Sequence, residues 1–186
     1  MDLNLILVCV VIVVALFFSY TNGFHDAANA IATSVSTRAW TPRAALLMAA
    51  AMNIIGAMMG TAVAKTVGSG IIQIKEYAES TTPEMQQKGL VIILAALLGA
   101  CIWNLITWWF GLPSSSSHAL IGGMVGAGLL SGTTVFWECI VDHVIIPMFA
   151  SPIIGFIIGY IAMKVVLWLL RKAQYHRTMR RFRAAQ

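Results

Sequence analysis

The sequence contains few charged residues, and this scarcity excludes an ordinary water-soluble domain. Asp, Glu, Lys and Arg make up only 10% of the 186 residues, whereas 59% are hydrophobic. A soluble domain carries about 25% charged residues. Uncharged runs long enough to cross a bilayer core of about 30 Å as helices lie at residues 3–21, 44–64, 89–110 and 144–163. We therefore predict an all-α integral membrane protein, because helices satisfy their own backbone hydrogen bonds in hydrocarbon.

Cysteine is also scarce. Cys9, Cys101 and Cys139 lack the spacing of metal ligands and the even count of a disulfide framework. We predict that they are packing residues, and we expect neither a metal centre nor a cofactor. The residues before the first apolar run include no basic side chain, so we interpret that run as a retained span and not as a signal peptide.

Basic residues are concentrated at one end of the chain. Half of the 12 lysines and arginines lie between residues 171 and 183, directly after the last apolar run. A basic segment next to a span is typical of the cytoplasmic side and contacts anionic membrane lipids, so we expect no nucleic-acid partner. We predict a transmembrane domain at residues 1–170 and a basic cytoplasmic tail at residues 171–186.

The same charge bias predicts the layout of the crossings. Arg38 and Arg43 flank a short turn that we place inside with the tail, whereas Asp2, Glu138 and Asp142 have no basic neighbour and fit the outside. We therefore predict a multi-pass protein of the cytoplasmic (inner) membrane whose N-terminus lies outside and whose C-terminal tail lies in the cytoplasm. About five crossings follow, at residues 3–38, 42–64, 89–110, 113–137 and 144–170.

Two of these passes are too irregular to be plain helices. Residues 3–38 would measure about 52 Å as one straight helix, so we predict a break at the "TNGF" stretch, residues 21–24. The pass at 113–137 begins with a proline and four serines and continues through four glycines, at 122, 123, 126 and 128. Glycines weaken a helix but allow close backbone approach, so we predict a discontinuous or re-entrant element.

Asp26 is the only charged residue between residues 3 and 37. About 18 Å of helix separates it from Arg38, which places it near the bilayer midplane, where a carboxylate typically marks a cation or proton site. If residues 3–21 cross alone, Asp26 instead lies at the outer interface. Three polar residues lie close to it in the sequence: Asn22, His25 and Asn29. His25 could instead be a hydrogen-bonded structural histidine, and Asn29 could simply cap or bridge helices. Oxygen ligands suit a hard cation, and His25 could transfer protons.

The stretch "PSSSSH" precedes the glycine-containing helix. Its hydroxyl groups and the free N–H groups of the first helical turn could converge on one point, with the positive end of the helix dipole behind them. We predict an anion site, because ordinary helix capping needs only one serine. The candidate residues are Ser114, Ser115, Ser116 and Ser117, and His118, which could bind the anion or only orient the loop.

Two longer stretches, "NGFHDAANAIATS" and "WNLITWWFGLPSSSSHALIGG", strongly resemble the inorganic phosphate transporter (PiT) family, which includes phosphate permeases and some sulfate permeases. The resemblance implies that Asp26 and Asn29 lie near the cation and phosphate sites and that Ser114 to Ser117 contribute to phosphate binding. "GFHD" stands where Gly-Ala-Asn-Asp is common in the family. It resembles the proton-coupled bacterial branch, which favours protons over sodium as the coupling ion.

The resemblance covers only the first half of such transporters, which contain two related halves of opposite orientation. It implies a fold that is one half of an inverted-repeat transporter, with residues from 171 onward resembling the start of a central connector. We expect a symporter that moves inorganic phosphate with H⁺ or Na⁺ and needs a second half or, failing that, a homo-oligomer. The resemblance leaves open that phosphate travels as a neutral metal complex.

Three other functions compete with this interpretation. Sulfate transport is the nearest, because sulfate and phosphate have nearly the same shape. A non-transporting assembly subunit would use the polar motifs only to join helices. Ser117, His118 and Asp26 supply the residue types of a hydrolase triad. Adjacent helix residues seldom face each other, however, and no "GxSxG" motif is present, so we predict that the protein is not an enzyme.

Overall fold

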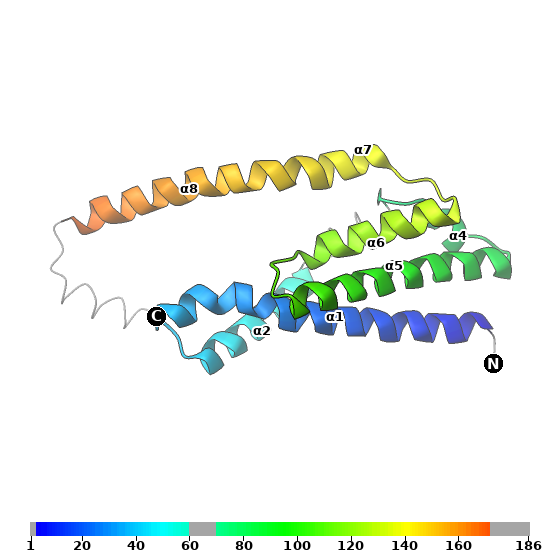
Figure 1. The fold of residues 1–186 in the computed structure, drawn as a ribbon, viewed down its shortest axis with the longest axis horizontal. Helices are drawn as coiled ribbons and strands as arrows, with labels where there is room; N and C mark the ends of the chain where they lie inside the picture. Colours follow the sequence, from blue (N-terminus) through cyan, green and yellow to red (C-terminus); the bar gives the residue numbers. More distant parts are fainter. Residues whose placement is uncertain (1–2, 60–69, 172–186) are drawn as a thin grey trace.

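The computed structural model describes residues 3–59 and 70–171, and within these ranges the chain is helical with no strand (Figure 1). An isolated bridge joins Ile72 and Val135. The predicted all-α class is confirmed. The helices are α1 (Leu3–Ser36), α2 (Pro42–Met59), α4 (Lys75–Ala78), α5 (Pro83–Trp109), α6 (Ser116–Ser131), α7 (Trp137–Ile140), the π-helix η1 (Val141–Ile145) and α8 (Ile146–Leu170).

Within residues 3–59 and 70–171, four helical segments are long and apolar enough to cross a membrane: α1, α2, α5 and the continuous run Trp137–Leu170. Helix α6 has 16 residues, or about 24 Å, and is shorter than a bilayer core. Figure 1 shows α5 and α6 as a hairpin whose tip lies between the two ends of the molecule, while α1 and α8 continue past it. The predicted irregular fourth pass is therefore present as the short arm of a hairpin, and the count of five crossings is not confirmed.

Helices α1 and α5 run parallel with a constant register. Three side-chain hydrogen bonds join them, Asn4 to Gln86, Asn104 to Thr21 and Thr107 to His25, with sequence separations of 82, 83 and 82. Thr107 lies near the end of α5, whereas α1 continues for several turns beyond His25. This register places His25 and Asp26 level with the tip of the α5–α6 hairpin.

The break predicted at residues 21–24 is wrong. Helix α1 is uninterrupted from Leu3 to Ser36, because it contains no proline and all its interior N–H groups can donate along the helix. The single Gly23 costs only about 1 kcal/mol in a helix interior. The Thr21 hydroxyl donates within the same helix, to the Phe18 carbonyl at 2.8 Å. A helix of this length spans a bilayer only by tilting or by extending beyond the hydrocarbon.

The hydrophobic core lies at the end of the hairpin remote from its tip. Gly123 of α6 packs so closely on α5 that a Cβ atom there would collide with the backbone carbonyl of Ala96. This contact brings the two arms together by dispersion and exclusion of lipid, as small residues do between membrane helices. The buried cluster consists of Ile71, Ile72, Ile92, Ala96, Met124, Val135 and Ile140.

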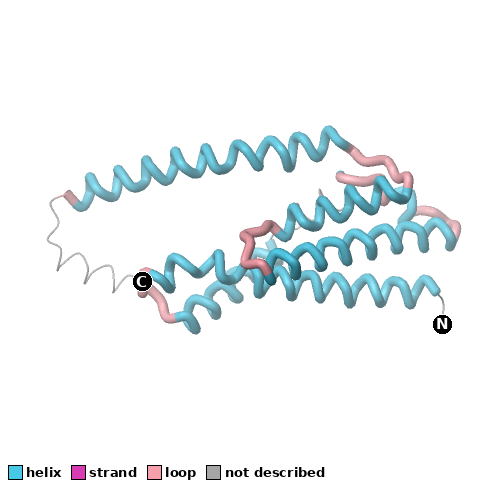
Figure 2. Tube along the Cα trace, in the orientation of Figure 1, coloured by secondary structure: helices cyan, strands magenta, loops and turns pink. Residues whose placement is uncertain are grey.

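Helix α8 stands apart from the other helices and contains no buried residue (Figure 2). Pro147 and Pro152 do not end it. The π-helix at Val141–Ile145 ends two residues before Pro147, and such a widened turn accommodates the missing N–H group of a proline. An apolar helix exposed on all sides suits contact with lipid or with further protein.

Candidate functional site

The two polar motifs meet in space. The Ser116 hydroxyl donates to Asp26 Oδ2 at 3.1 Å, across 90 positions of sequence. The parallel register brings Asp26 level with the end of α5, and a tight turn then returns the chain into α6. Gly111 supports this turn with a φ of 63°, a conformation that glycine adopts without strain. A carboxylate and the serine-rich helix start therefore form one site at the hairpin tip.

His25 contacts the other carboxylate oxygen. Its Nδ1 lies 3.2 Å from Asp26 Oδ1, and its Nε2 lies 3.4 Å from Thr107 Oγ1. The His25 side chain is only 6% exposed, whereas that of Asp26 is 42% exposed. Asp26 thus has a polar partner on each oxygen and still keeps open space beside it.

A polar ladder continues from His25 along the interface of α1 and α5. The Thr107 hydroxyl also lies 3.0 Å from the Trp103 carbonyl and 3.1 Å from the Asn104 carbonyl. Asn104, which is 1% exposed, donates to Thr21 Oγ1 at 3.5 Å. The sequence motifs pointed to neither Thr107 nor Asn104. The signal was their i, i+3 spacing in an uncharged span, which places both on one helix face.

A cavity of about 540 Å³ lies between α1 and α2, and Asp26 is among the residues that line it. Asn22 lines it, and its Oδ1 is buried without a hydrogen-bond partner among the described residues. Asn53 of α2 was not predicted; its Nδ2 donates to the Ala49 carbonyl at 2.9 Å, which leaves Oδ1 as an acceptor. The cavity is lined by Ser19, Asn22, Gly23, Asp26, Ala27, Ala30, Leu46, Ala49, Ala50 and Asn53.

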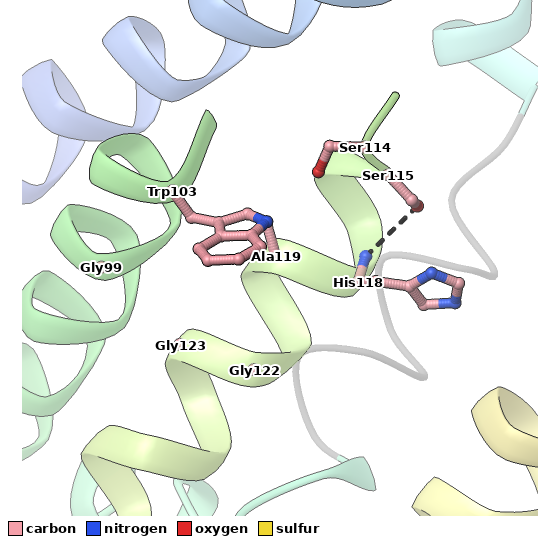
Figure 3. A pocket seen from close by; sticks show the side chains of 8 residues that line it. All are labelled: Gly99, Trp103, Ser114, Ser115, His118, Ala119, Gly122 and Gly123. Carbon is pink, nitrogen blue, oxygen red and sulfur yellow. Dashed lines mark hydrogen bonds between the residues drawn. The ribbon is translucent and has the colours of Figure 1, made fainter. Parts of the chain in front are cut away.

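A second cavity, of about 510 Å³, lies between α5 and α6 (Figure 3). Figure 3 shows the Trp103 side chain on the α5 side of α6 and the His118 ring pointing away from it on the other side, with Ser115 capping the helix. The Ser115 hydroxyl accepts from the His118 backbone N–H at 3.4 Å. The polar side chains here offer O–H and N–H groups and no carboxylate, a donor set that suits an anion. The remaining lining residues are Gly99, Ala119, Gly122 and Gly123.

The predicted site residues divide among these places. Ser114, Ser115 and His118 line the α5–α6 cavity, Ser116 bonds to Asp26, and Ser117 is exposed and lines neither cavity. The expected convergence of all four hydroxyls on one point is therefore not observed, because successive helix residues point about 100° apart. Asn29 is exposed and likewise lines neither cavity, although it shares α1 with Asp26.

Comparison with known proteins identifies the family. The sequence model described as the Phosphate transporter family matches residues 22–185, which include both motifs. The chain belongs to the phosphate transporter family. The resemblance of the two motifs is thereby confirmed, and because the relatives are named as transporters, the hydrolase alternative is set aside. Membrane-length helices in a transporter family also indicate a multi-pass membrane protein.

Several members of the phosphate transporter family are similar to this chain over nearly its whole length. It is 56% identical over 184 residues to the "Probable low-affinity inorganic phosphate transporter" of Streptomyces halstedii, covering 99% of this chain and 82% of the relative. It is 43% identical to the protein of the same description from Bacillus subtilis, covering 100% of this chain and 54% of that relative.

A solved structure described as "The sodium-dependent phosphate transporter" is similar as well. The TM-score is 0.77 with 28% sequence identity, and the match covers 87% of this chain and 39% of that one. The chain therefore spans about half of the Bacillus relative and less than half of the solved transporter.

Proposed function

We propose that this chain is the first half of a proton-coupled phosphate symporter. The observation that carries the proposal is the Ser116 to Asp26 hydrogen bond of 3.1 Å. It joins a serine-rich helix start, which suits an oxyanion, to a carboxylate that suits a cation or proton. One site then binds both transported species, which is what coupling requires.

The anion is assigned to the start of α6. Ser114, Ser115 and His118 present donors to the α5–α6 cavity, and the first turn of a 16-residue helix adds free N–H groups and the positive end of its dipole. Ser116 and Ser117 follow in the same turn. Such a site holds an oxyanion without a fixed positive charge, so that it can also release it.

The coupling ion is assigned to Asp26 and its neighbours. Asn22 and Asp26 line the α1–α2 cavity, and Asn29 lies one turn further along α1. A proton is favoured over sodium because Asp26 contacts the imidazole of His25, a side chain that can bind and release a proton. The solved relative described as sodium-dependent supports Na⁺ as the alternative.

The proposal includes a second half. Helix α8 is exposed along its length, and the chain covers 54% of the Bacillus relative. A separate second half, or a second copy, would cover the open side of the site and rock against this half during alternating access. We place the N-terminus outside the cytoplasmic membrane and residues 171–186 inside; of this tail, only Arg171 lies within the described residues.

Phosphate is favoured over sulfate because Asp26 is a hydrogen-bond acceptor. Near neutral pH phosphate carries a proton that it can donate to a carboxylate, whereas sulfate does not. The proposal needs no cofactor. Whether phosphate travels free or as a neutral metal complex is tested by adding a chelator of divalent cations to the uptake assay.

The test is uptake of labelled phosphate into membrane vesicles that contain the chain alone or joined to a second transporter half. We expect uptake that is stimulated by an inward proton gradient and little affected by excess sulfate. Sodium-driven uptake at equal pH would replace the proton by Na⁺, and strong competition by sulfate would make the chain a sulfate permease. Absence of uptake with either arrangement, despite normal insertion, would support a non-transporting subunit.

A further inference from the structure

We propose that His25 is the group that carries the coupling proton and that Thr107 is its positioning residue. This inference rests on the proposed symport and adds to it the atom that holds the proton. Asp26 then acts as the fixed counter-charge. The observations that carry it are the two contacts of the His25 ring, one at each nitrogen, in a side chain that is 6% exposed.

The Nδ1 atom of His25 is a donor. It lies 3.2 Å from Asp26 Oδ1, and an ionised carboxylate can only accept. The Ser116 hydroxyl donates to the other oxygen, Oδ2. The Asp26 carboxylate thus accepts from both sides, while 42% of its side chain remains exposed. The N–H of Nδ1 therefore stays in place, and the exchangeable proton belongs to Nε2.

The partner of Nε2 can serve both charge states. Thr107 Oγ1 lies 3.4 Å from His25 Nε2, and 3.0 and 3.1 Å from the carbonyl oxygens of Trp103 and Asn104. When Nε2 carries a proton, the Thr107 hydroxyl accepts a hydrogen bond from the Nε2–H group and donates its own hydrogen to one of these carbonyls. When Nε2 is bare, the hydroxyl rotates and donates to it. Neither state leaves a buried nitrogen unpaired, which would be costly.

Protonation of His25 would change the charge next to the anion site. A neutral His25 leaves Asp26 as an uncompensated negative charge beside Ser116, which repels phosphate. A charged His25 at 3.2 Å cancels that charge locally, because opposite charges this close attract each other even beside an exposed carboxylate. Proton binding and phosphate binding at the hairpin tip therefore favour each other, which is a physical basis for symport.

No other titratable group forms a hydrogen bond or ion pair with His25 among the described residues. The charged residues of α5 lie near its start, at the end remote from Thr107. The titratable groups of α1 and the elements packed near it are Cys9, Tyr20 and Asp26 in α1, Arg43 in α2, Glu84, Lys88 and Cys101 in α5, and His118 in α6.

The decisive experiment compares Thr107→Val with Thr107→Ser in the vesicle assay, with phosphate uptake measured across a range of external pH. Valine removes the one hydrogen-bond partner that Nε2 has among the described residues. The charged N–H loses more hydrogen-bond energy than the neutral nitrogen does. We expect the pH of half-maximal uptake to fall by roughly 0.5–1 unit for Thr107→Val, and serine to restore the original profile. A uniform loss of uptake at every pH would show only a packing role and would overturn the inference.

A second variant does not depend on Thr107. His25→Asn keeps a donor for Asp26 but cannot carry a proton, so we expect it to abolish phosphate-dependent acidification of the vesicle lumen. Exchange of labelled for unlabelled phosphate at equal pH should remain measurable, at a reduced rate. Acidification equal to that of the unaltered chain would overturn the inference. If the unaltered chain neither exchanges nor accumulates phosphate, the proposed function itself has failed, which is a different result.

Discussion

Ser116 Oγ donates to Asp26 Oδ2 at 3.1 Å, although 90 residues separate the two in the chain. Ser116 is 4% exposed and takes its position from the start of α6, whereas Asp26 lies within the uninterrupted α1. The bond therefore depends on the α5–α6 hairpin placing its tip beside the middle of another helix. Movement of α6 relative to α1 would break this bond, so it links the arrangement of the helices directly to the site.

Asp26→Asn should abolish proton-driven phosphate uptake, by about a hundredfold or more, without lowering the amount of protein in the membrane. The amide has nearly the same shape and can still accept from Ser116, but it has lost the charge that balances the cation. Labelled uptake with immunoblot quantification measures both effects. The matched control is Asp142→Asn, whose carboxyl group is exposed in η1. Unchanged uptake by Asp26→Asn would show that the Asp26 charge is not needed for coupling.

Ser116→Ala should reduce phosphate uptake roughly tenfold, because a hydrogen bond to a charged group contributes about 1.5–3 kcal/mol. Ser117→Ala should have a smaller effect, since Ser117 is exposed and lines neither cavity. Initial rates at saturating and limiting phosphate separate lost binding from lost turnover. Ser131→Ala, at the far end of the same helix, is the control. Equal losses for Ser116→Ala and Ser131→Ala would mean that α6 stability, and not the bond to Asp26, was changed.

Asn53→Leu should weaken the response to the proton gradient by several-fold while leaving membrane insertion normal. Asn53 lines the same cavity as Asp26. Among the described residues its Nδ2 bonds only to Ala49 of its own helix, so its removal costs little stability. The loss of one acceptor near the carboxylate makes the cavity less favourable for a cation or for water. The measurement is the ratio of uptake with and without a pH gradient, and an unaltered ratio would exclude this cavity from the coupling pathway.

Gly123→Ala should destabilise the hairpin by about 1–3 kcal/mol, the usual cost of overpacking. Its Cβ would meet the Ala96 backbone carbonyl, which cannot rotate away. Gly126→Ala is the matched control, because a Cβ there meets nothing within 4 Å and alanine favours a helix by up to about 1 kcal/mol. Thermal unfolding in detergent should therefore shift in opposite directions for the two variants. A parallel shift would contradict the close α5–α6 contact.

Much of the candidate site could be predicted from the chain alone, because its residues are exceptions to their surroundings. Asp26 stands out as the one charge in a long apolar run, and the four serines stand out beside Pro113. What could not be predicted was which serine contacts Asp26 and which serines line the α5–α6 cavity. Which hydroxyl reaches Asp26 depends on the rotation of α6 about its axis, and a rotation of 100° moves the contact to the next residue.

Thr107 and Asn104 illustrate the other limit. Each is an ordinary polar residue in an apolar helix, a type that more often joins helices than carries out chemistry. Their importance follows from the parallel register of α1 and α5, with its separations of 82 and 83 residues. No local pattern encodes that offset, because it results from the packing of two whole helices.

The amino-acid sequence by itself determined that this protein lies in a membrane as helices and that Asp26 and the serine run are its unusual polar groups. Hydrophobicity and the cost of unpaired backbone groups act locally along the chain, so they can be evaluated residue by residue. Only the tertiary structure decided that α1 stays unbroken, that α5 and α6 form a hairpin, and that Ser116 and His25 contact opposite oxygens of Asp26. These outcomes depend on helix packing over distances that local propensities do not reach.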